Sequence, residues 1–303
     1  MKLAALDLGS NSFLCLIAEV DSSEKFHVLH DEVKVVRLGQ ELGKTGSLHS
    51  EALKRADQCL KHFSEVIKSF QVDHVEAVAT AAAREAENAE EFIQICENYK
   101  IPLTTISGEE EALMSFRGAI RPDEKEKVLL IDIGGGSTEH TVGTLKKIEL
   151  AQSIPYGAVK LTEKYIQNQP VPTEQEKELR EFIRKRSEEL WAQVEALQPQ
   201  KIWAVAGTPT ALAAAILGKF DRDQIEGMVL NRQLLIDWLN KFRNSSIEEK
   251  KQKYGLGDRS DVIFAGVVIL DELLGRLNLK EIHISTRGIR YGLAYQMVSR
   301  YNN

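Results

Sequence analysis

The chain has 303 residues, of which 43% are hydrophobic and 28% are charged, and its formal net charge is −6. This length suits two domains of ordinary size, and the composition is that of a soluble globular protein. The negative charge argues against nonspecific binding of nucleic acid. The longest apolar run, residues 262–270, is too short to span a bilayer, and Asp7 interrupts the apolar N-terminus before a signal peptide could form. We therefore expect a cytoplasmic protein that does not bind or span a membrane.

Cysteine and histidine spacing excludes two further classes. The three cysteines, Cys15, Cys59 and Cys96, lie far apart, and the seven histidines show no metal-binding spacing. A disulfide framework or a zinc site is therefore not expected. Any metal would be a hard ion held by carboxylates.

The first elements in chain order are predicted to be a three-stranded meander. Its apolar runs are 3–7, 13–20 and 26–38, and a D-S-S-E turn at 21–24 separates the last two. Helical spacing of apolar residues over 50–70 predicts a long helix. The elements expected after it are a strand at 75–79, a helix at 84–99, a strand at 103–106 and a helix starting at Ser107.

The same pattern restarts at Val128. Strands are predicted at 128–132, 139–144 and 148–154, followed by helices at 158–166 and 174–197, the second opened by a capping box at 173–176. The remaining elements expected are a strand at 202–206, helices around Ala211, Leu234 and Val262, a strand at I-H-I-S (282–285) and a last helix from about Arg287.

The two halves share a motif as well as a pattern. D-L-G-S-N-S at 7–12 aligns with D-I-G-G-G-S at 132–137, at a constant offset of 125 residues (132 minus 7). We therefore predict two duplicated α/β domains that meet in the charged stretch 121–127. The first comprises 1–120 with the returning final helix, 288–303, and the second comprises 121–287.

Each aligned motif is a Gly-rich turn directly after a strand, which allows backbone amides to approach an anion. We expect the two loops to bind phosphate from opposite sides of an interdomain cleft that closes on substrate. The alternative is that they are tight hairpin turns whose glycines only supply positive φ. The predicted phosphate-binding residues of the loops are Gly9, Ser10, Asn11, Ser12, Gly134, Gly135, Gly136 and Ser137.

These loops resemble those of the exopolyphosphatase and guanosine pentaphosphate phosphatase (Ppx/GppA) family. The resemblance extends along the chain through several further stretches: R-L-G at 37–39, L-G-K-T-G-S-L at 42–48, T-A-A-A-R-E-A at 80–86, S-G-E-E-E-A at 107–112, P-Y-G-A-V-K-L-T-E at 155–163, G-T-P-T-A-L-A-A at 207–214 and R-S-D-V-I-F-A-G at 259–266. It implies two actin-like (ribonuclease H-like) domains. Leu14 and Tyr291 depart from the family pattern and leave substrate preference open.

The resemblance also implies the reacting groups. It places the general base on Glu110. The spacing of Ser107 and Glu110 also fits a capping box, in which Glu110 would cap its own helix. Burial beside phosphate would raise the pKa of this glutamate toward neutrality. It assigns Mg²⁺ to Asp132 and Glu139, with Asp7 as a further candidate ligand. Arg84, Gly207 and Thr208 are expected to contact substrate phosphate.

The predicted function is therefore Mg²⁺-dependent exopolyphosphatase activity, which releases orthophosphate from the end of inorganic polyphosphate. Guanosine pentaphosphate, which also ends in a phosphoanhydride, is the alternative substrate. Two other classes are less favoured: a sugar kinase or actin-like ATPase, and a non-catalytic alarmone-binding sensor. Oligomeric state is left open, with a homodimer as one option.

Overall fold

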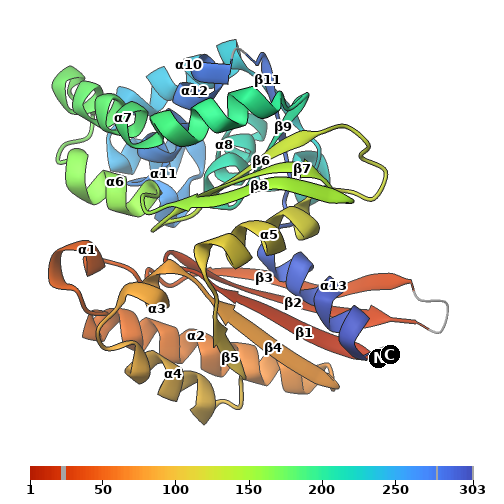
Figure 1. Cartoon of the computed structure of the whole chain (residues 1–303). Coiled ribbons are helices and arrows are strands. Elements are labelled where there is room, and N and C mark those ends of the chain that lie inside the picture. The colour runs from red at the N-terminus through yellow and green to blue at the C-terminus, as the bar shows by residue number, and fades with distance from the viewer. Residues whose placement is uncertain (22–24, 278, 302–303) are drawn as a thin grey trace. The chain divides into compact units, whose positions relative to one another are not determined.

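The structure, a computed structural model, describes residues 1–21, 25–277 and 279–301 (Figure 1). It divides into two compact units, Met1–Ala119 with Arg287–Asn303, and Ile120–Thr286. Residues 22–24 of the predicted D-S-S-E turn lie outside the described residues. Within the described ranges, no helix has the length and apolarity needed to cross a membrane.

The first unit is built on a five-stranded mixed sheet in the order β3-β2-β1-β4-β5. β1, β2 and β3 are antiparallel, whereas β4 runs parallel to β1 and β5 parallel to β4. The strands are β1 Lys2–Leu8, β2 Ser12–Val20, β3 Phe26–Val35, β4 His74–Ala79 and β5 Leu103–Thr105. The helices are α1 Leu42–Thr45, α2 Ser50–Ser69, α3 Ala81–Glu85, α4 Ala89–Asn98, α5 Gly108–Ala119 and α13 Ile289–Tyr301.

The second unit repeats this plan in a six-stranded sheet, β10-β11-β9-β6-β7-β8. Its strands are β6 Val128–Ile133, β7 Thr138–Thr144, β8 Lys147–Ile154, β9 Lys201–Val205, β10 Val229–Asn231 and β11 Glu281–Ile284. Its helices are α6 Ala158–Tyr165, α7 Thr173–Leu197, α8 Gly207–Leu217, α9 Arg222–Ile225, α10 Arg232–Arg243, α11 Ile247–Tyr254 and α12 Ile263–Leu277, with a 3-10 turn at Gly257–Arg259.

The predicted fold class, two α/β halves of one pattern, is confirmed. In both sheets an antiparallel meander (β1–β3 or β6–β8) continues into parallel strands on the other side of its first strand. Two local predictions are wrong. The helix expected over 84–99 is interrupted because Ala86 is extended, with φ −77° and ψ 133°. The capping box at 173–176 does not form, because Thr173 is already helical and Pro172 occupies the N-cap.

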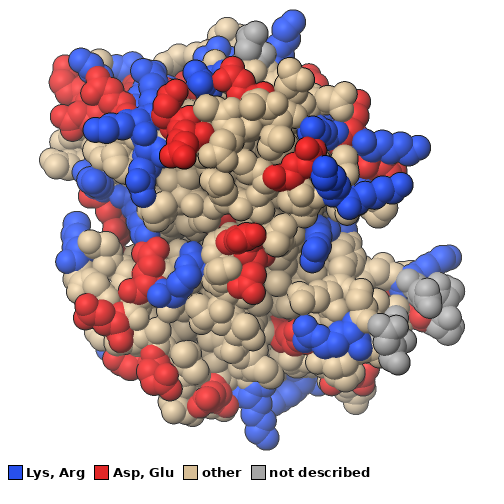
Figure 2. Space-filling model, in the orientation of Figure 1, with Lys and Arg blue, Asp and Glu red and all other residues tan. Residues whose placement is uncertain are grey.

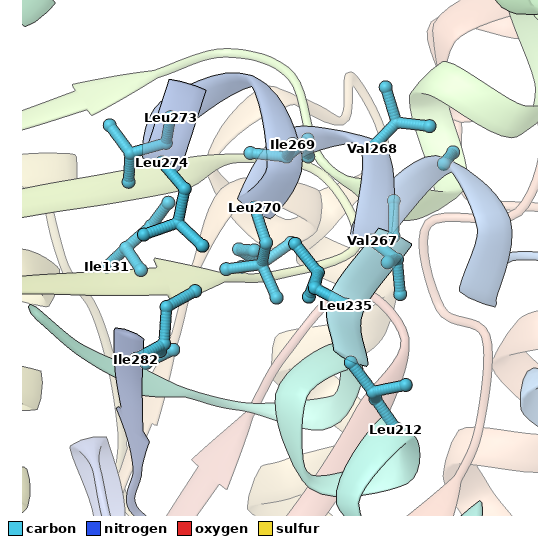
Figure 3. Packing of buried hydrophobic residues seen from close by; sticks show 14 of the residues in the cluster. Ile131, Leu212, Leu235, Val267, Val268, Ile269, Leu270, Leu273, Leu274 and Ile282 are labelled. Atoms are coloured by element: carbon cyan, nitrogen blue, oxygen red, sulfur yellow. The ribbon is translucent and has the colours of Figure 1, made fainter. Parts of the chain in front are cut away.

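The core of the second unit is centred on α12. Figure 3 shows side chains of this helix between Leu212 and Leu235 of neighbouring helices and Ile131 and Ile282 of the sheet. Residues 263–274 are all buried, and the first eight of them, 263–270, are apolar, as expected for a helix enclosed on every face. The helix thereby fixes the strands that carry the second glycine loop.

The final helix joins the first unit through close backbone contact. A Cβ on Gly118 of α5 would lie 2.0 Å from the carbonyl oxygen of Gly288, and one on Gly292 would lie 2.0 Å from that of Met114. Only glycine fits at such a crossing, because the obstructing atoms belong to the backbone. α5 and α13 therefore pack as a tightly fitted pair.

A buried lysine in the second unit is expected to make the free energy of unfolding depend on pH. Lys250 of α11 is fully buried, and its Nζ donates to Oε1 of Gln169. Burial lowers the pKa of Lys250 to about 8. A lysine has a pKa of about 10.4 in an unfolded chain, so between these values the unfolded state binds more protons and stability rises with pH.

We expect Lys250→Met to remove this dependence. From pH 7 to pH 10, the unfolding free energy of the wild type should rise by about 1–3 kcal/mol relative to the variant. Urea unfolding at both pH values measures the difference, and Lys251→Met, at an exposed neighbour, is the matched control. A constant difference between wild type and Lys250→Met would show that this lysine titrates as it does in water.

Candidate active site

The first glycine loop connects β1 to β2 and is held by backbone contacts. The Gly9 amide donates to the carbonyl of Ser12 at 3.1 Å. The Ser10 carbonyl accepts from the Gly39 amide at 2.8 Å, and Ser10 Oγ accepts from the Ala82 amide at 3.1 Å. The loop is therefore attached both to the 36–39 segment after β3 and to α3.

The second loop connects β6 to β7 and has the same internal bond. The Gly134 amide donates to the carbonyl of Ser137, also at 3.1 Å. Its support differs, because the carbonyl of Gly134 accepts from the amide of Ala158 at 2.9 Å, in the first turn of α6. The Gly135 carbonyl accepts from the next two amides of that turn, at 3.0 and 3.2 Å.

These contacts revise which loop groups can meet a phosphate. The amides of Gly9 and Gly134, which the motifs predict as phosphate ligands, are instead used within the loops. The amides that bond to no acceptor among the described residues are those of Ser10, Asn11, Gly135 and Gly136. Of the predicted hydroxyls, Ser12 Oγ accepts from Asn11 Nδ2 at 3.3 Å and Ser137 is buried. Each loop therefore has two neighbouring amides that are available to an anion.

Arg84 lies on α3, a helix that contacts the first loop. It follows three buried alanines in α3, the helix whose Ala82 amide bonds to Ser10. Its Nη1 donates to the carbonyl of Ile106 at 2.6 Å and lies 3.5 Å from Oε2 of Glu111. Its Nε and Nη2 have no acceptor among the described residues. One nitrogen thus holds the guanidinium in place while the other two can form a bidentate contact with an anion.

The two neighbouring glutamates of α5 have different environments. Glu110 is exposed and forms the alternative that its spacing allowed, a capping box: Ser107 N donates to Oε2 at 2.8 Å, and Glu110 N donates to Ser107 Oγ at 3.2 Å. The bond from the Ser107 amide lowers the pKa of Glu110, opposite to the predicted rise. Glu111 is buried, with 5% of its surface exposed, and contacts Arg84. The sequence offers the acidic run 109–111 as a source of the base, and the resemblance selects Glu110 from it, because burial is not visible in the sequence.

Asp132 and Glu139 are direct cross-strand neighbours on β6 and β7. Both are buried, and Oε1 of Glu139 accepts from Ser153 Oγ at 2.7 Å. Two carboxylates in this position repel each other unless a cation lies between or beside them. In the first unit the residue opposite Asp7 is Leu14, which the offset of 125 residues equates with Glu139. Only the second loop therefore has a pair of acidic neighbours.

The donor set suits Mg²⁺, which takes one or two carboxylates and completes its octahedron with water and substrate oxygens. Among the described residues, no group of three or more His, Cys, Asp or Glu side chains is arranged to hold a metal. An ion held by these two carboxylates would complete its coordination with water and substrate oxygens.

Gly207 and Thr208 begin α8, at the end of β9. A Cβ on Gly207 would lie 1.5 Å from Nη1 of Arg259, so the guanidinium of Arg259 occupies the space that the glycine leaves. Removal from water lowers the pKa of Arg259 to about 10. This residue, which spacing gave no reason to select, places a cation beside the predicted phosphate contact.

Comparison with known proteins finds relatives along almost the whole chain. The model of the Ppx/GppA phosphatase family matches residues 16–301. The chain is 30% identical to Exopolyphosphatase 2 of Mycobacterium tuberculosis, over 98% of both chains. It is 32% identical to a bifunctional 3-dehydroquinate synthase/phosphatase of Fusobacterium nucleatum, over 89% of this chain but only 43% of the length of that protein. A solved PPX-GPPA enzyme of Aquifex aeolicus has a TM-score of 0.81 at 29% identity, with 98% of this chain and 99% of that one covered.

Proposed function

We propose, from the premise that this chain belongs to the Ppx/GppA phosphatase family, that it is an exopolyphosphatase. The reaction is hydrolysis of the terminal phosphoanhydride bond of inorganic polyphosphate, with release of orthophosphate. The observation that carries the proposal is the pair of glycine loops, each with two neighbouring amides available to an anion and one with two buried carboxylates beside it.

Affinity for a polyanion must come from these local groups, because the chain carries a net charge of −6. On the face seen in Figure 2, acidic and basic side chains are interspersed and form no broad basic surface. A hydrogen bond to a charged group contributes about 1.5–3 kcal/mol. A few loop amides and Arg84 can therefore hold a phosphate group without a positive surface.

The chemical step needs a water nucleophile, a base to orient and deprotonate it, and positive groups on the phosphoryl oxygens. Glu111 suits the base better than Glu110, because the carboxylate of Glu110 is engaged in its cap and exposed. Glu111 is buried beside Arg84. If Arg84 holds a phosphoryl oxygen, the carboxylate of Glu111 lies near the reacting phosphate. Asp132 and Glu139 would hold Mg²⁺, which neutralises charge on phosphate oxygens when bound.

The metal assignment predicts a shifted requirement for Mg²⁺. Glu139→Gln keeps the shape of the side chain and its bond to Ser153 but removes one charged ligand. We expect half-maximal activation to need about tenfold more Mg²⁺ or greater, with Asp132→Asn giving a similar shift. A titration of activity against Mg²⁺ measures this, with Glu149→Gln on β8 as the control. Full activity of the wild type in excess EDTA would rule out the metal.

The proposed substrate is tested by turnover of four compounds side by side: long polyphosphate, tripolyphosphate, guanosine pentaphosphate and ATP. We expect the highest kcat/KM with long polyphosphate. A higher kcat/KM with guanosine pentaphosphate would mean that this compound is the preferred substrate, hydrolysed by the same reaction. Turnover of ATP alone would favour a kinase-like or ATPase function, and no turnover at all would favour a sensor.

A further inference from the structure

The first turn of α6 supports the second glycine loop from behind. Three consecutive amides of this turn, those of Ala158, Val159 and Lys160, donate to the carbonyls of Gly134 and Gly135. The amides at the start of a helix otherwise have no partner in the helix. Here the loop carbonyls accept hydrogen bonds from these amides, so the start of α6 has its partners within the protein.

These bonds determine where the loop amides point. In a trans peptide, the C=O of one residue and the N–H of the next are directed to opposite sides. Because the Gly134 and Gly135 carbonyls point toward α6, the N–H groups of Gly135 and Gly136 point away from it. These are the two amides of this loop that remain available for an anion.

Gly157 allows this close approach. A Cβ at this residue would lie 2.4 Å from the carbonyl oxygen of Gly134 and 2.6 Å from the carbonyl carbon of Gly135. Its φ of −146° and ψ of −178° are open to any residue, so space and not conformation requires the glycine. The obstructing atoms are backbone atoms of the loop and cannot move without turning its peptides.

We propose that Gly157 and the first turn of α6 are positioning elements that fix the amides of Gly135 and Gly136 toward substrate phosphate. The motif P-Y-G-A at 155–158 thereby acquires a role beyond its place in the fold. A second contact strengthens the arrangement: Thr138, which follows the loop, donates from Oγ1 to the Tyr156 carbonyl at 2.8 Å in a buried position. The inference rests on the proposed function for the identity of the anion.

The test compares two glycine substitutions of equal steric cost. Gly157→Ala places a methyl group against the loop. Gly143→Ala, in the β7–β8 hairpin of the same unit, places one 2.5 Å from the carbonyl oxygen of Lys147 and touches no loop group. Both are buried glycines obstructed by backbone. The probe is inorganic tripolyphosphate in excess EDTA without Mg²⁺, so that no metal-dependent hydrolysis accompanies binding, which is measured by calorimetry at a temperature where both variants are folded.

We expect Gly157→Ala to weaken binding of tripolyphosphate about 10- to 100-fold, since a hydrogen bond to a charged group is lost or misdirected. Gly143→Ala should bind within about twofold of the wild type, even where its thermal midpoint falls equally. Wild-type affinity in both variants would overturn the proposal. An equal loss of affinity in both variants would also overturn it.

Thr138→Val decides the matter if Gly157→Ala does not fold. It is close in shape, removes one hydrogen bond, and is expected to weaken binding about three- to tenfold. Wild-type affinity in this variant would then overturn the proposal. A wild type that binds no tripolyphosphate would instead refute the proposed function, so the two failures are distinguishable.

Discussion

Glu111→Gln is expected to lower the turnover of polyphosphate by about 10²–10⁴-fold, the usual cost of losing a general base. Glutamine keeps the size of the side chain and can still accept a hydrogen bond from Arg84. The acid limb of the pH profile of kcat/KM should also disappear, because that limb reports ionisation of the base. A residue that only supports Arg84 would not remove the limb.

Its neighbours provide the comparison. Glu110→Gln should keep turnover within about threefold and lower the thermal midpoint only slightly, since its capping contacts are exposed. Glu109→Gln, which changes the same charge on an exposed residue, is the control for both. A large loss in Glu110→Gln together with an active Glu111→Gln would return the base to Glu110, as the family resemblance implies.

Asp31→Asn is expected to destabilise the first unit by about 3–5 kcal/mol, because it breaks a buried ion pair and leaves a buried cation. Asp31 Oδ1 accepts from Arg290 Nε at 2.8 Å, and Oδ2 accepts from Arg290 Nη2 at 3.1 Å and from Tyr291 OH at 3.0 Å. The side chains of Asp31 and Arg290 are only 4% and 5% exposed. The contact fastens the start of α13 to β3.

Glu76→Gln on β4 offers a matched control, because Glu76 contacts the other end of α13. Glu76 Oε1 accepts from Arg300 at 2.6 Å and from Tyr301 OH at 3.0 Å, but this site is exposed. Such pairs contribute about 0–1 kcal/mol. The three tryptophans, at 191, 203 and 238, all lie in the second unit, so unfolding should be followed by far-UV circular dichroism and by hydrogen exchange of α13 amides. Equal effects of the two variants would mean that the Asp31 pair gains nothing from burial.

Much of the fold was predictable because its signals are local. The strands before each loop are short apolar runs that end at an aspartate, and the offset of 125 residues places the loops at equivalent points. The interruption of the helix after Thr80 was not predictable, because neither Ala86 nor its neighbours are glycine or proline. Burial of single charges was equally hidden: nothing in the spacing of the charged stretch 177–186 shows that Arg180 donates to Asp271 and Glu272, at 2.7 and 2.6 Å.

The site shows the same division. The family resemblance selects Arg84, Asp132 and Glu139, and motif spacing selects the two loops. It does not separate Glu110 from Glu111, whose difference is the face of α5 on which each lies. Nor does it show which amides the loops use internally, since Gly9 and Gly134 differ from their neighbours only in hydrogen bonding. The support from α6 and from Arg259 depends on segments distant in sequence.

The most direct test of the proposed reaction is phosphorus NMR of long polyphosphate incubated with the protein and Mg²⁺, because orthophosphate, chain-end and chain-interior phosphates give separate signals. Removal of one terminal phosphate at a time should raise orthophosphate and lower the interior signal from the first turnovers, while the chain-end signal stays constant. A rise in the chain-end signal without orthophosphate, or unchanged spectra, would contradict the assignment of this protein as an exopolyphosphatase.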